Sequence, residues 1–582
     1  MKHTRSLLAA TLALTLAACS QQTAVSPAAS APAVSDSTAA YLVGFKQTSL
    51  GTQSLSEQAA VQALAIAAAG GVVTSQWADI SAAAVRLTPA ALAKLRSNPL
   101  VEYVEQEAVH HALGSRHLST DAEATAKPGT GTPITTQAVY TPNGEYTWGD
   151  NALRVPALRT AGYTGAATTK VAVCITDTGI DGTHPEFQHK LKGFKNFVTT
   201  EANRNDPYAL NDVSHHGTHV SGTVFAQYGS GTGAAGLQPG EDANGVGGVA
   251  SGTDLYMARV LGDAGSGSSA GIINGVNWCV AQLKSQGGAE DKVVISMSLG
   301  GGSKTTTEQR AYTAAYNKGA LIVAATGNDG AAVSYPAAYT NVVGVAAVDN
   351  TLAKASFSNF GTQVDLSGPG VGVLSSVPLG AGAAASANGG GVTFTGVTGA
   401  DKSSKTTFTG TIVKAGDGTG TAGNNEFCGT STRNAALAGT IALISRGTCT
   451  FEEKVANASA SGAKAVMIYN NAAGPLGMSL TNTYTIPVVG LQQTDGQSLL
   501  TKLPTTGTVS VTTADYEYFD GTSMATPHVS AAAAVVWAAK PTLTNTQLLN
   551  LLTSTAKDLG TTGKDNNFGY GLVDPYKAIT GN

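Results

Sequence analysis

Uninterrupted apolar runs alternate with helix-like segments in the part of the chain that begins near Trp148. Segments at 266–286 and 306–319 have helical periodicity, and four apolar runs that end in turn residues lie at 170–179, 293–301, 320–329 and 342–349. Strands that are apolar along their whole length are buried on both faces of a sheet. The pattern therefore predicts an α/β fold, a mostly parallel sheet covered by helices in three layers.

A smaller unit precedes this region, from Tyr41 to Leu113. Its pattern predicts strands at 41–46, 83–88 and 101–111, with helices at 56–71 and 89–99 between them. This β-α-β-α-β order predicts a small α+β domain over residues 41–113. Polar stretches rich in Ala, Ser, Pro, Gly and Thr flank it, so we expect a flexible tether at 20–40 and an exposed linker at 114–140.

The pattern changes after Ser376 and returns near Tyr516. The sequence between them is rich in Gly, Thr and Ala with frequent turn signals, and helix–strand units reappear at 439–471. We therefore expect residues 379–514 to form a domain inserted into a loop of the core, which comprises residues 141–378 and 515–582.

The first residues have the layout of a signal peptide. Lys2 and Arg5 precede an apolar run at 7–16 that is too short to span a bilayer. The run leads into Leu16-Ala17-Ala18-Cys19, which resembles a bacterial lipobox and predicts a signal peptide over 1–19 with lipidation of Cys19. The alternative is a plain secretory signal cut after an A-x-A site. Either way we expect an exported, extracellular protein, and a lipobox implies a cell-surface lipoprotein anchored to the membrane without spanning it.

Composition narrows the classes of function. Charged residues make up 12% of the chain, about half the usual share, and the chain has 70 glycines. The 34 basic and 38 acidic side chains give a net charge of −4. No basic patch of the kind that a nucleic-acid surface needs is evident in the sequence, so we expect no nucleic-acid partner.

Five cysteines are present, and four are left when Cys19 is assigned to lipidation. Four cysteines in an oxidising compartment allow three pairings. Among these we expect the disulfides Cys428–Cys449 and Cys174–Cys279. The spacing of the cysteines and histidines does not suggest a zinc site.

Three polar residues mark the ends of structural segments in the core. Asp177 ends the first apolar run, His216 heads a helical stretch, and Ser523 lies between a glycine turn and an alanine-rich helix. Serine is a nucleophile when a base accepts its proton, and histidine can be that base when a carboxylate orients it. Singly, each residue also has a structural interpretation: a turn former, a helix-start residue and an N-cap.

The motifs around these residues are longer than the residues themselves. DTGID at 177–181, HGTHVSGT at 216–223 and GTSMATPHVS at 521–530 occur in this order. They resemble those of the subtilisin-like serine proteases, the subtilase family (peptidase S8). This resemblance implies a subtilisin-like core whose catalytic triad is the following set: Asp177, His216 and Ser523.

The resemblance extends to further residues of the site. The segment LIVAATGNDG implies that the Asn328 amide completes the oxyanion hole with the Ser523 backbone N–H. The neighbours His215 and His219 are structural in this interpretation. Ser298, Leu299 and Gly300 would form a peptide-binding edge by β-augmentation, and Gly327 would line the first specificity pocket. Because that pocket holds small uncharged residues, we expect a broad endopeptidase that prefers a large apolar residue before the cleaved bond.

Calcium binding is a further expectation. The segment EDANGVGGVA at 241–250 resembles the calcium loop of the family, with Asp242, Asn244 and Val246 as ligands and Glu186 where the family has an Asp ligand. Such oxygen ligands suit a structural Ca²⁺ ion. A glycine-rich surface loop is the alternative.

The accessory parts resemble known modules. Residues 41–113 resemble the inhibitor-type (I9) propeptide of subtilases, and the insertion at 379–514 resembles a protease-associated (PA) domain. We therefore expect a monomeric zymogen whose own propeptide inhibits it, cut somewhere in 111–137. A permanent N-terminal domain is the alternative for 41–113.

Two other functions are compatible with parts of the sequence. A catalytically dead surface-binding protein would depend on the PA-like insertion, but Asp177, His216, Ser523 and Asn328 are all present. An esterase of the α/β-hydrolase type would have its serine before the acid and the histidine, within a GxSxG motif. Here the serine comes last, and Ser523 does not lie within such a motif. A serine endopeptidase that acts on proteins and peptides is the favoured interpretation.

Overall fold

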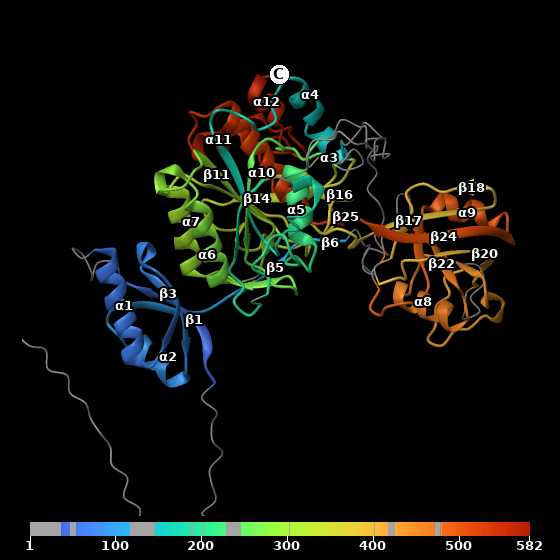
Figure 1. The fold of residues 1–582 in the computed structure, drawn as a ribbon, viewed down its shortest axis with the longest axis horizontal. Coiled ribbons are helices and arrows are strands. Elements are labelled where there is room, and N and C mark those ends of the chain that lie inside the picture. The colour runs from blue at the N-terminus through green and yellow to red at the C-terminus, as the bar shows by residue number, and fades with distance from the viewer. Residues whose placement is uncertain are drawn as a thin grey trace, which may run out of the picture.

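The computed structural model of the chain describes residues 37–46, 54–116, 146–187, 190–201, 203–228, 246–301, 303–400, 402–416, 425–471, 476, 478 and 480–582. The expected signal peptide with Cys19, most of the tether and most of the linker lie outside these residues. Three bodies follow one another, an N-terminal body, a central body and a third body (Figure 1). None of the helices in the described ranges is long and apolar enough to cross a membrane.

The N-terminal body is a four-stranded antiparallel sheet with two helices. The sheet order is β2-β3-β1-β4, formed by β1 (Ala39–Phe45), β2 (Val72–Trp77), β3 (Ala82–Leu87) and β4 (Val101–Gln106), with helices α1 (Leu55–Ala69) and α2 (Pro89–Arg96). The predicted β-α-β-α-β order was wrong because Val72–Trp77 forms an additional strand. This segment pairs with β3 as an edge strand and is only partly buried, so its apolar pattern is weak.

The predicted last strand of this body, at 101–111, is not one continuous strand of the sheet. Residues 101–106 stay in the sheet as β4, whereas β5 (Val109–Ala112) and β6 (Ser115–Arg116) leave it and pair with the central body. The N-terminal body is thus connected to the central body both by the chain and by strand pairing.

The central body contains a seven-stranded parallel sheet, which confirms the predicted α/β fold with its mostly parallel sheet. Its order is β15-β14-β13-β11-β7-β9-β8. The strands are β7 (Val171–Asp177), β8 (Leu191–Asn196), β9 (Asp254–Arg259), β11 (Lys292–Met297), β13 (Leu321–Ala325), β14 (Val343–Val348) and β15 (Val364–Pro369). Every residue of β7, β13 and β14 is buried, as expected for strands covered on both faces.

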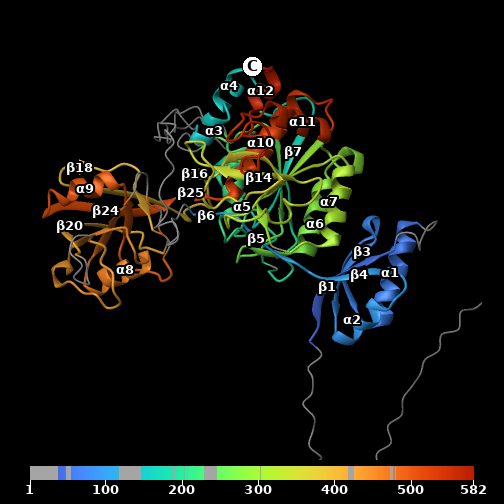
Figure 2. The same cartoon turned by 180° about the vertical axis from the view of Figure 1, so that it is seen from behind.

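Helices cover both faces of this sheet, as Figures 1 and 2 show from opposite sides. One apolar cluster joins the sheet to α6 (Ser269–Val280) and α7 (Thr306–Asn317). The other cluster joins it to α3 (Trp148–Ala152), α4 (Val155–Thr160), α5 (His216–Phe225), α10 (Thr522–Ala539), α11 (Asn545–Thr555) and α12 (Pro575–Thr580). Helix α10 is buried from Thr522 to Ala538, and its four consecutive alanines at 531–534 let it pack closely on the sheet.

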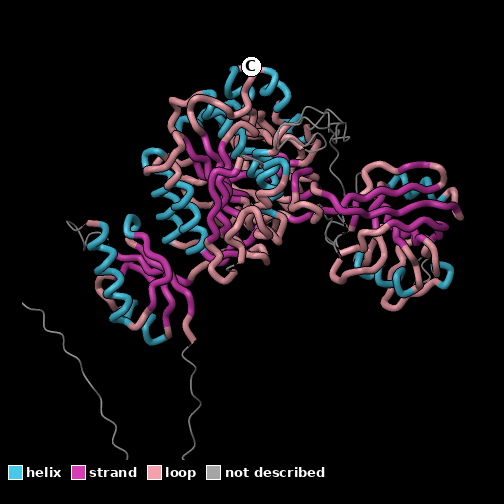
Figure 3. Tube along the Cα trace, in the orientation of Figure 1, coloured by secondary structure: helices cyan, strands magenta, loops and turns pink. Residues whose placement is uncertain are grey.

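The third body corresponds to the expected insertion and is built on one mixed sheet (Figure 3). The sheet order is β18-β17-β24-β20-β21-β22-β23-β19, and β20 to β23 run parallel. Its elements are β17 (Gly382–Gly389), β18 (Val392–Thr393), β19 (Thr398–Gly399), β20 (Thr407–Lys414), β21 (Ile441–Ser445), β22 (Ala465–Tyr469), β23 (Val488–Leu491), β24 (Thr505–Ala514), α8 (Phe451–Ala460) and α9 (Gln493–Leu500). Apolar clusters on its two faces give this body a core of its own.

Two paired strands connect the third body to the central body. The chain enters through β16 (Val373–Ser376) and returns through β25 (Tyr516–Asp520), which pair with each other in antiparallel register. β17 and β24 continue this ladder into the third body, pairing from Gly382 with Ala514 to Gly389 with Gly507.

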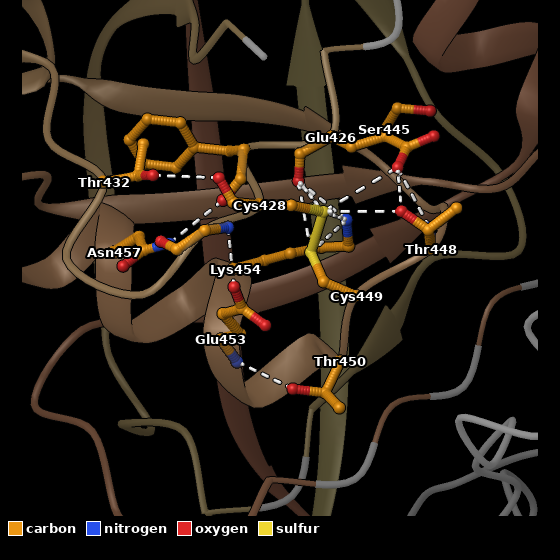
Figure 4. Close-up of a disulfide and its surroundings, with 12 residues drawn as sticks. Glu426, Cys428, Thr432, Ser445, Thr448, Cys449, Thr450, Glu453, Lys454 and Asn457 are labelled. Atoms are coloured by element: carbon orange, nitrogen blue, oxygen red, sulfur yellow. Dashed lines mark hydrogen bonds between the residues drawn. A yellow bond between two sulfur atoms is a disulfide. The ribbon is translucent and has the colours of Figure 1, made fainter. Parts of the chain in front are cut away.

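The structure contains two disulfides. Cys174–Cys279 ties β7 to α6 with an S–S distance of 2.00 Å, and Cys428–Cys449 lies in the third body with 2.07 Å. Figure 4 shows that the buried Lys454 amino group approaches the second disulfide and donates to the Glu426 carbonyl oxygen (2.7 Å). The disulfides Cys174–Cys279 and Cys428–Cys449 are the two pairings expected from the sequence.

Candidate active site

A buried hydrogen bond joins Asp177, the last residue of β7, to His216, the first residue of α5. Nδ1 of His216 lies 2.7 Å from Oδ1 of Asp177, which also accepts from the Thr178 backbone N–H at 2.7 Å. Because a carboxylate only accepts hydrogen bonds, Nδ1 carries the proton and Nε2 is the free acceptor of the ring. Nε2 is buried without a hydrogen-bond partner among the described residues.

A second carboxylate fixes the backbone around this pair. Asp212 accepts from the Thr218 backbone N–H (2.8 Å) and hydroxyl (2.6 Å), and from the Thr178 hydroxyl (2.8 Å). Burial raises the pKa of Asp212, and the hydrogen bonds from the two threonines oppose that rise. The Thr178 hydroxyl in turn accepts from the Gly217 N–H at 2.9 Å, so the turn after Asp177 and the start of α5 are held together.

Ser523 lies in the first turn of α10 and is fully buried. The N-cap of this helix is Gly521, so the interpretation of Ser523 as an N-cap was wrong. Its hydroxyl donates to the Ser298 carbonyl oxygen (2.9 Å), and the Ser298 hydroxyl donates back to the Ser523 carbonyl oxygen (2.8 Å). These reciprocal bonds attach the start of α10 to the segment that follows β11.

Pro527 explains why the Ser523 carbonyl is available for this contact. In a helix, the N–H of residue 527 would donate to the carbonyl of residue 523, but proline has no N–H. The carbonyl oxygen left free in this way is the one that accepts from Ser298. The proline inside the buried helix therefore serves the connection between Ser523 and Ser298.

The Asn328 amide is oriented by the residue that precedes Ser523. Its Oδ1 accepts from the Thr522 backbone N–H and hydroxyl, both at 2.9 Å. The carbonyl oxygen of the amide is thereby assigned, and Nδ2 points the other way as a donor.

The cleft is occupied by the chain's own segment 109–116. β5 lies between β10 (Ser266–Ser268) and β12 (Leu299–Gly300) and is antiparallel to both. The backbone N–H groups of Ala112 and Leu113 donate to Gly265 (2.8 Å) and Ser298 (3.2 Å). Further along, β6 pairs with β25, so the segment crosses the cleft from one side to the other.

The Leu113 carbonyl oxygen accepts two hydrogen bonds from the site. Asn328 Nδ2 donates at 2.7 Å and the Ser523 backbone N–H at 3.1 Å. The next residue, Gly114, lies against the free ring nitrogen: a Cβ added to it would lie 2.8 Å from Nε2 of His216. The peptide bond Leu113–Gly114 is thus placed among the groups singled out from the sequence.

The Leu113 side chain enters a subsite of small residues. A Cβ on Gly300 would lie 2.6 Å from the Leu113 Cδ1 and 3.4 Å from the Ser334 hydroxyl. Gly327 has a φ of +114° and borders the same hydroxyl, which donates to the Thr326 carbonyl oxygen (2.8 Å). Gly300, Gly327 and Ser334 carry no charge.

The other histidines near the site hold structure. His219 is fully buried, stacks on Phe519 at 4.2 Å, and its Nε2 contacts the carbonyl oxygens of Val373 (3.0 Å) and Glu517 (3.1 Å). Desolvation, with a smaller effect of His216, lowers the pKa of His219 to about 3. Burial likewise lowers the pKa of His528 to about 4, so both rings are neutral at ordinary pH.

The expected calcium ligands are only partly described. Asp242 and Asn244 lie outside the described residues, whereas Val246 and Glu186 are buried. The Glu186 carboxylate accepts from the Tyr516 hydroxyl (2.9 Å) and the Gln227 backbone N–H (2.7 Å). Within the described ranges, no group of three or more His, Cys, Asp or Glu side chains could hold a metal ion. The calcium site therefore stays a prediction from the sequence.

Sequence reasoning missed several contributors to the cleft. The segment 265–268, which forms its second edge, is a glycine- and serine-rich stretch that resembles a loop. Thr522, which orients Asn328, and Glu308, which contacts β5, carry no motif that distinguishes them. For 265–268 the signal in the sequence is its position a few residues after the apolar segment that forms β9 (Asp254–Arg259).

Comparisons with known proteins agree with these motifs. Residues 168–571 match the model of the family described as "Subtilase family". Subtilisin NAT of Bacillus subtilis subsp. natto is 32% identical over 345 residues, 58% of this chain and 74% of that protein. Subtilisin of Bacillus pumilus is 36% identical over 238 residues, 40% of this chain and 75% of that protein.

A solved structure is similar as well. It is the psychrophilic subtilisin-like protease Apa1 from the Antarctic psychrotroph Pseudoalteromonas sp. AS-11, which is 31% identical with a TM-score of 0.55. The match covers 75% of this chain and 97% of that one, so it extends well beyond the motifs.

Proposed function

Because this chain belongs to the subtilase family and is a serine endopeptidase, we propose that Asp177, His216 and Ser523 are its catalytic triad. One observation carries the proposal: the Leu113 carbonyl oxygen accepts from both Asn328 and the Ser523 backbone N–H. A carbonyl held by two donors beside a serine hydroxyl and a free imidazole nitrogen is arranged for acyl transfer.

Asp177, His216 and Ser523 have different roles in the proposed cleavage of the peptide bond. His216 Nε2 takes the proton of Ser523 as the hydroxyl turns from the Ser298 carbonyl and its oxygen attacks the substrate carbonyl carbon. Asp177 keeps the proton on Nδ1 and stabilises the imidazolium that forms. The imidazolium then gives its proton to the leaving amine. Water repeats the sequence on the acyl-enzyme and releases the acid product.

We propose that the two donors on Leu113 form the oxyanion hole. Charge develops on the substrate oxygen in the tetrahedral intermediate, so a donor aimed at it stabilises the transition state more than the substrate. The bonds from Thr522 to Asn328 fix that amide before the reaction starts, which removes the cost of orienting it during the reaction.

We propose further that residues 41–113 are an inhibitory propeptide of the I9 type. Glu105 accepts from the backbone N–H groups of Thr306 and Thr307, and Glu107 accepts from that of Ala270. These carboxylates cap the N-termini of α7 and α6, where the helix dipoles favour negative charge. The face of the N-terminal sheet that includes Leu42 and Trp77 packs on the same two helices in one apolar cluster.

The bond between Leu113 and Gly114 is the proposed processing site. Expressed as the full chain, the wild-type protein should lose its N-terminal part and begin at Gly114, since the carbonyl of this bond accepts from the two donors. The Ser523→Ala variant should stay uncut. Intact mass spectrometry with N-terminal sequencing measures both outcomes.

Ser530→Ala is the matched control, because Ser530 lies in the same buried helix and donates to Ser296 away from the cleft. It should process like the wild type. A mature N-terminus far from Gly114, or full processing of Ser523→Ala at low concentration, would contradict this proposal.

Replacing Asn328 by Leu tests the oxyanion hole. The side chain is of similar size but cannot donate, and kcat on a peptide substrate should fall about 10²- to 10³-fold, as known for subtilisin, with little change in KM. An unchanged kcat, measured on protein matured in trans, would remove Asn328 from the mechanism.

The small uncharged subsite around Gly300 implies a preference for large apolar residues before the cleaved bond. Peptides with Leu or Phe at the position of Leu113 should have a kcat/KM at least about tenfold above those with Lys or Asp, since a charge there would be buried without a partner. Changes at the position of His111, which is exposed, should alter rates by only about threefold. A preference for Lys would contradict the proposal.

The remaining assignments are also proposals. We propose that the protein is exported and lipidated at Cys19 and that residues 379–514 are a PA domain. We also propose that a structural calcium ion is held by the ligands expected from the sequence, Glu186, Asp242, Asn244 and Val246. The PA-domain proposal is supported by the separate apolar cores of the central body and the third body, which β16 and β25 connect. Release of Cys19→Ala from the membrane fraction tests the anchor, and a Tm unchanged by chelation of calcium would exclude the ion.

A further inference from the structure

The most deeply buried side chain of the strand in the cleft is His110, not Leu113. The His110 side chain is 0% exposed, whereas His111 is exposed and Leu113 is half-buried. His110 lies three residues before Leu113, on the fourth position before the proposed cleavage site. We call its surroundings the fourth subsite, lined by Gly301, Glu308, Tyr335 and Tyr339.

Glu308 forms the floor of the fourth subsite. Its carboxylate is 0% exposed and accepts from Nε2 of His110 at 2.6 Å and from the Tyr339 hydroxyl at 2.8 Å. Burial opposes the ionisation of Glu308, but the hydrogen bonds and the charge of its neighbours, His110 first, hold its pKa below the usual range. The carboxylate therefore accepts from both groups, and Nε2 of His110 is a donor.

Two tyrosines and a glycine complete the fourth subsite. The ring centroids of Tyr335 and Tyr339, whose hydroxyl holds Glu308, lie 4.5 Å apart. On the other side, a Cβ added to Gly301 would lie 3.1 Å from Nδ1 of His110. The backbone N–H of Gly301 is fixed by the Tyr335 carbonyl oxygen at 2.8 Å, so this wall is rigid.

From these contacts we infer that Glu308 is a specificity-determining residue that selects substrates with histidine at the fourth position before the cleaved bond. An apolar side chain there would cover the carboxylate without supplying the donor that His110 supplies, and a buried acceptor left without a partner is costly. This inference rests on the proposed endopeptidase cleft and adds a polar selection to the apolar one of the first subsite.

A purely structural role for Glu308 is the alternative. Glu308 lies in the first turn of α7, and its backbone N–H donates to the Thr305 hydroxyl (3.2 Å), so it could serve only to stabilise the helix start. A structural role predicts that substitutions change stability or overall activity, but not the ratio of rates for two substrates.

The experiment uses the self-processed enzyme and three quenched peptides, X-His-Ala-Leu-Gly-Ser-Arg, which copy residues 110–116 with X as His, Ala or Leu. For the wild type, kcat/KM should be at least about tenfold higher with His than with Ala. Glu308→Gln should reduce this ratio to about threefold or less and leave the Ala peptide within about twofold of the wild type. Glu308→Leu should favour the Leu peptide over the His peptide.

Asp291→Asn is the control, since Asp291 precedes β11 at the end of the sheet opposite Ser298 and pairs with Lys284 on the surface. Its ratios should match the wild type. Equal rates for His and Ala in the wild type, or a His preference that persists in Glu308→Leu, would overturn the inference. If no peptide is cut in a Ser523-dependent way, the proposed function fails instead.

Should Glu308→Leu not mature, a second variant keeps the inference testable. In the full chain, His110→Leu combined with Glu308→Leu should restore self-processing that Glu308→Leu alone has lost, because leucine then meets leucine in the fourth subsite. Processing that stays equally poor in the double variant would count against a direct contact between the two residues.

Discussion

The rest of the structure depends on the edges of two strands, β10 and β12, which face each other across the width of one strand. β10 and β12 do not pair with each other, and β5 lies between them and pairs with both. Because side chains alternate along a strand, the pairing fixes which residues point into the subsites and which point to water. It also fixes the distance from the His110 side chain to the Leu113 carbonyl oxygen, so the proposed inhibition, cleavage position and selectivity all depend on the same backbone pairing.

The chemical groups depend on a second constraint, the contact of α10 with the carboxyl ends of the parallel strands. Asp177 ends β7 and Ser298 follows β11. Ser523 lies near them because the alanine-rich helix α10 can run buried against the sheet. The alanines that allow this close packing take no part in the chemistry. Pro527 has no N–H, so the Ser523 carbonyl oxygen can accept the hydrogen bond from Ser298 that attaches the helix. Residues that carry no chemistry thus hold Ser523 against Ser298.

Much of this could be predicted from the sequence, for physical reasons. Continuous apolar strands have few alternatives to a parallel sheet, and Asp177, His216, Ser523 and Asn328 lie within motifs long enough to exclude coincidence. Strand β2 could not be predicted, because a half-exposed edge strand has only a weak pattern of apolar residues. The position of the Leu113–Gly114 bond and the contact of His110 with Glu308 could not be predicted, because both depend on pairing across some two hundred residues, which no local pattern records.

The third body enters and leaves the central body through β16 and β25, whose ends are so close that the Val377 N–H donates to the Asp515 carbonyl oxygen at 2.8 Å. Topologically, residues 378–514 are the loop of one β-hairpin. Since the ladder of β17 and β24 holds its own ends together, this loop adds little closure entropy to the core, whatever its length. A subtilase core can therefore exchange such a domain for another, or for a short turn, without rebuilding β25, the strand that leads into α10.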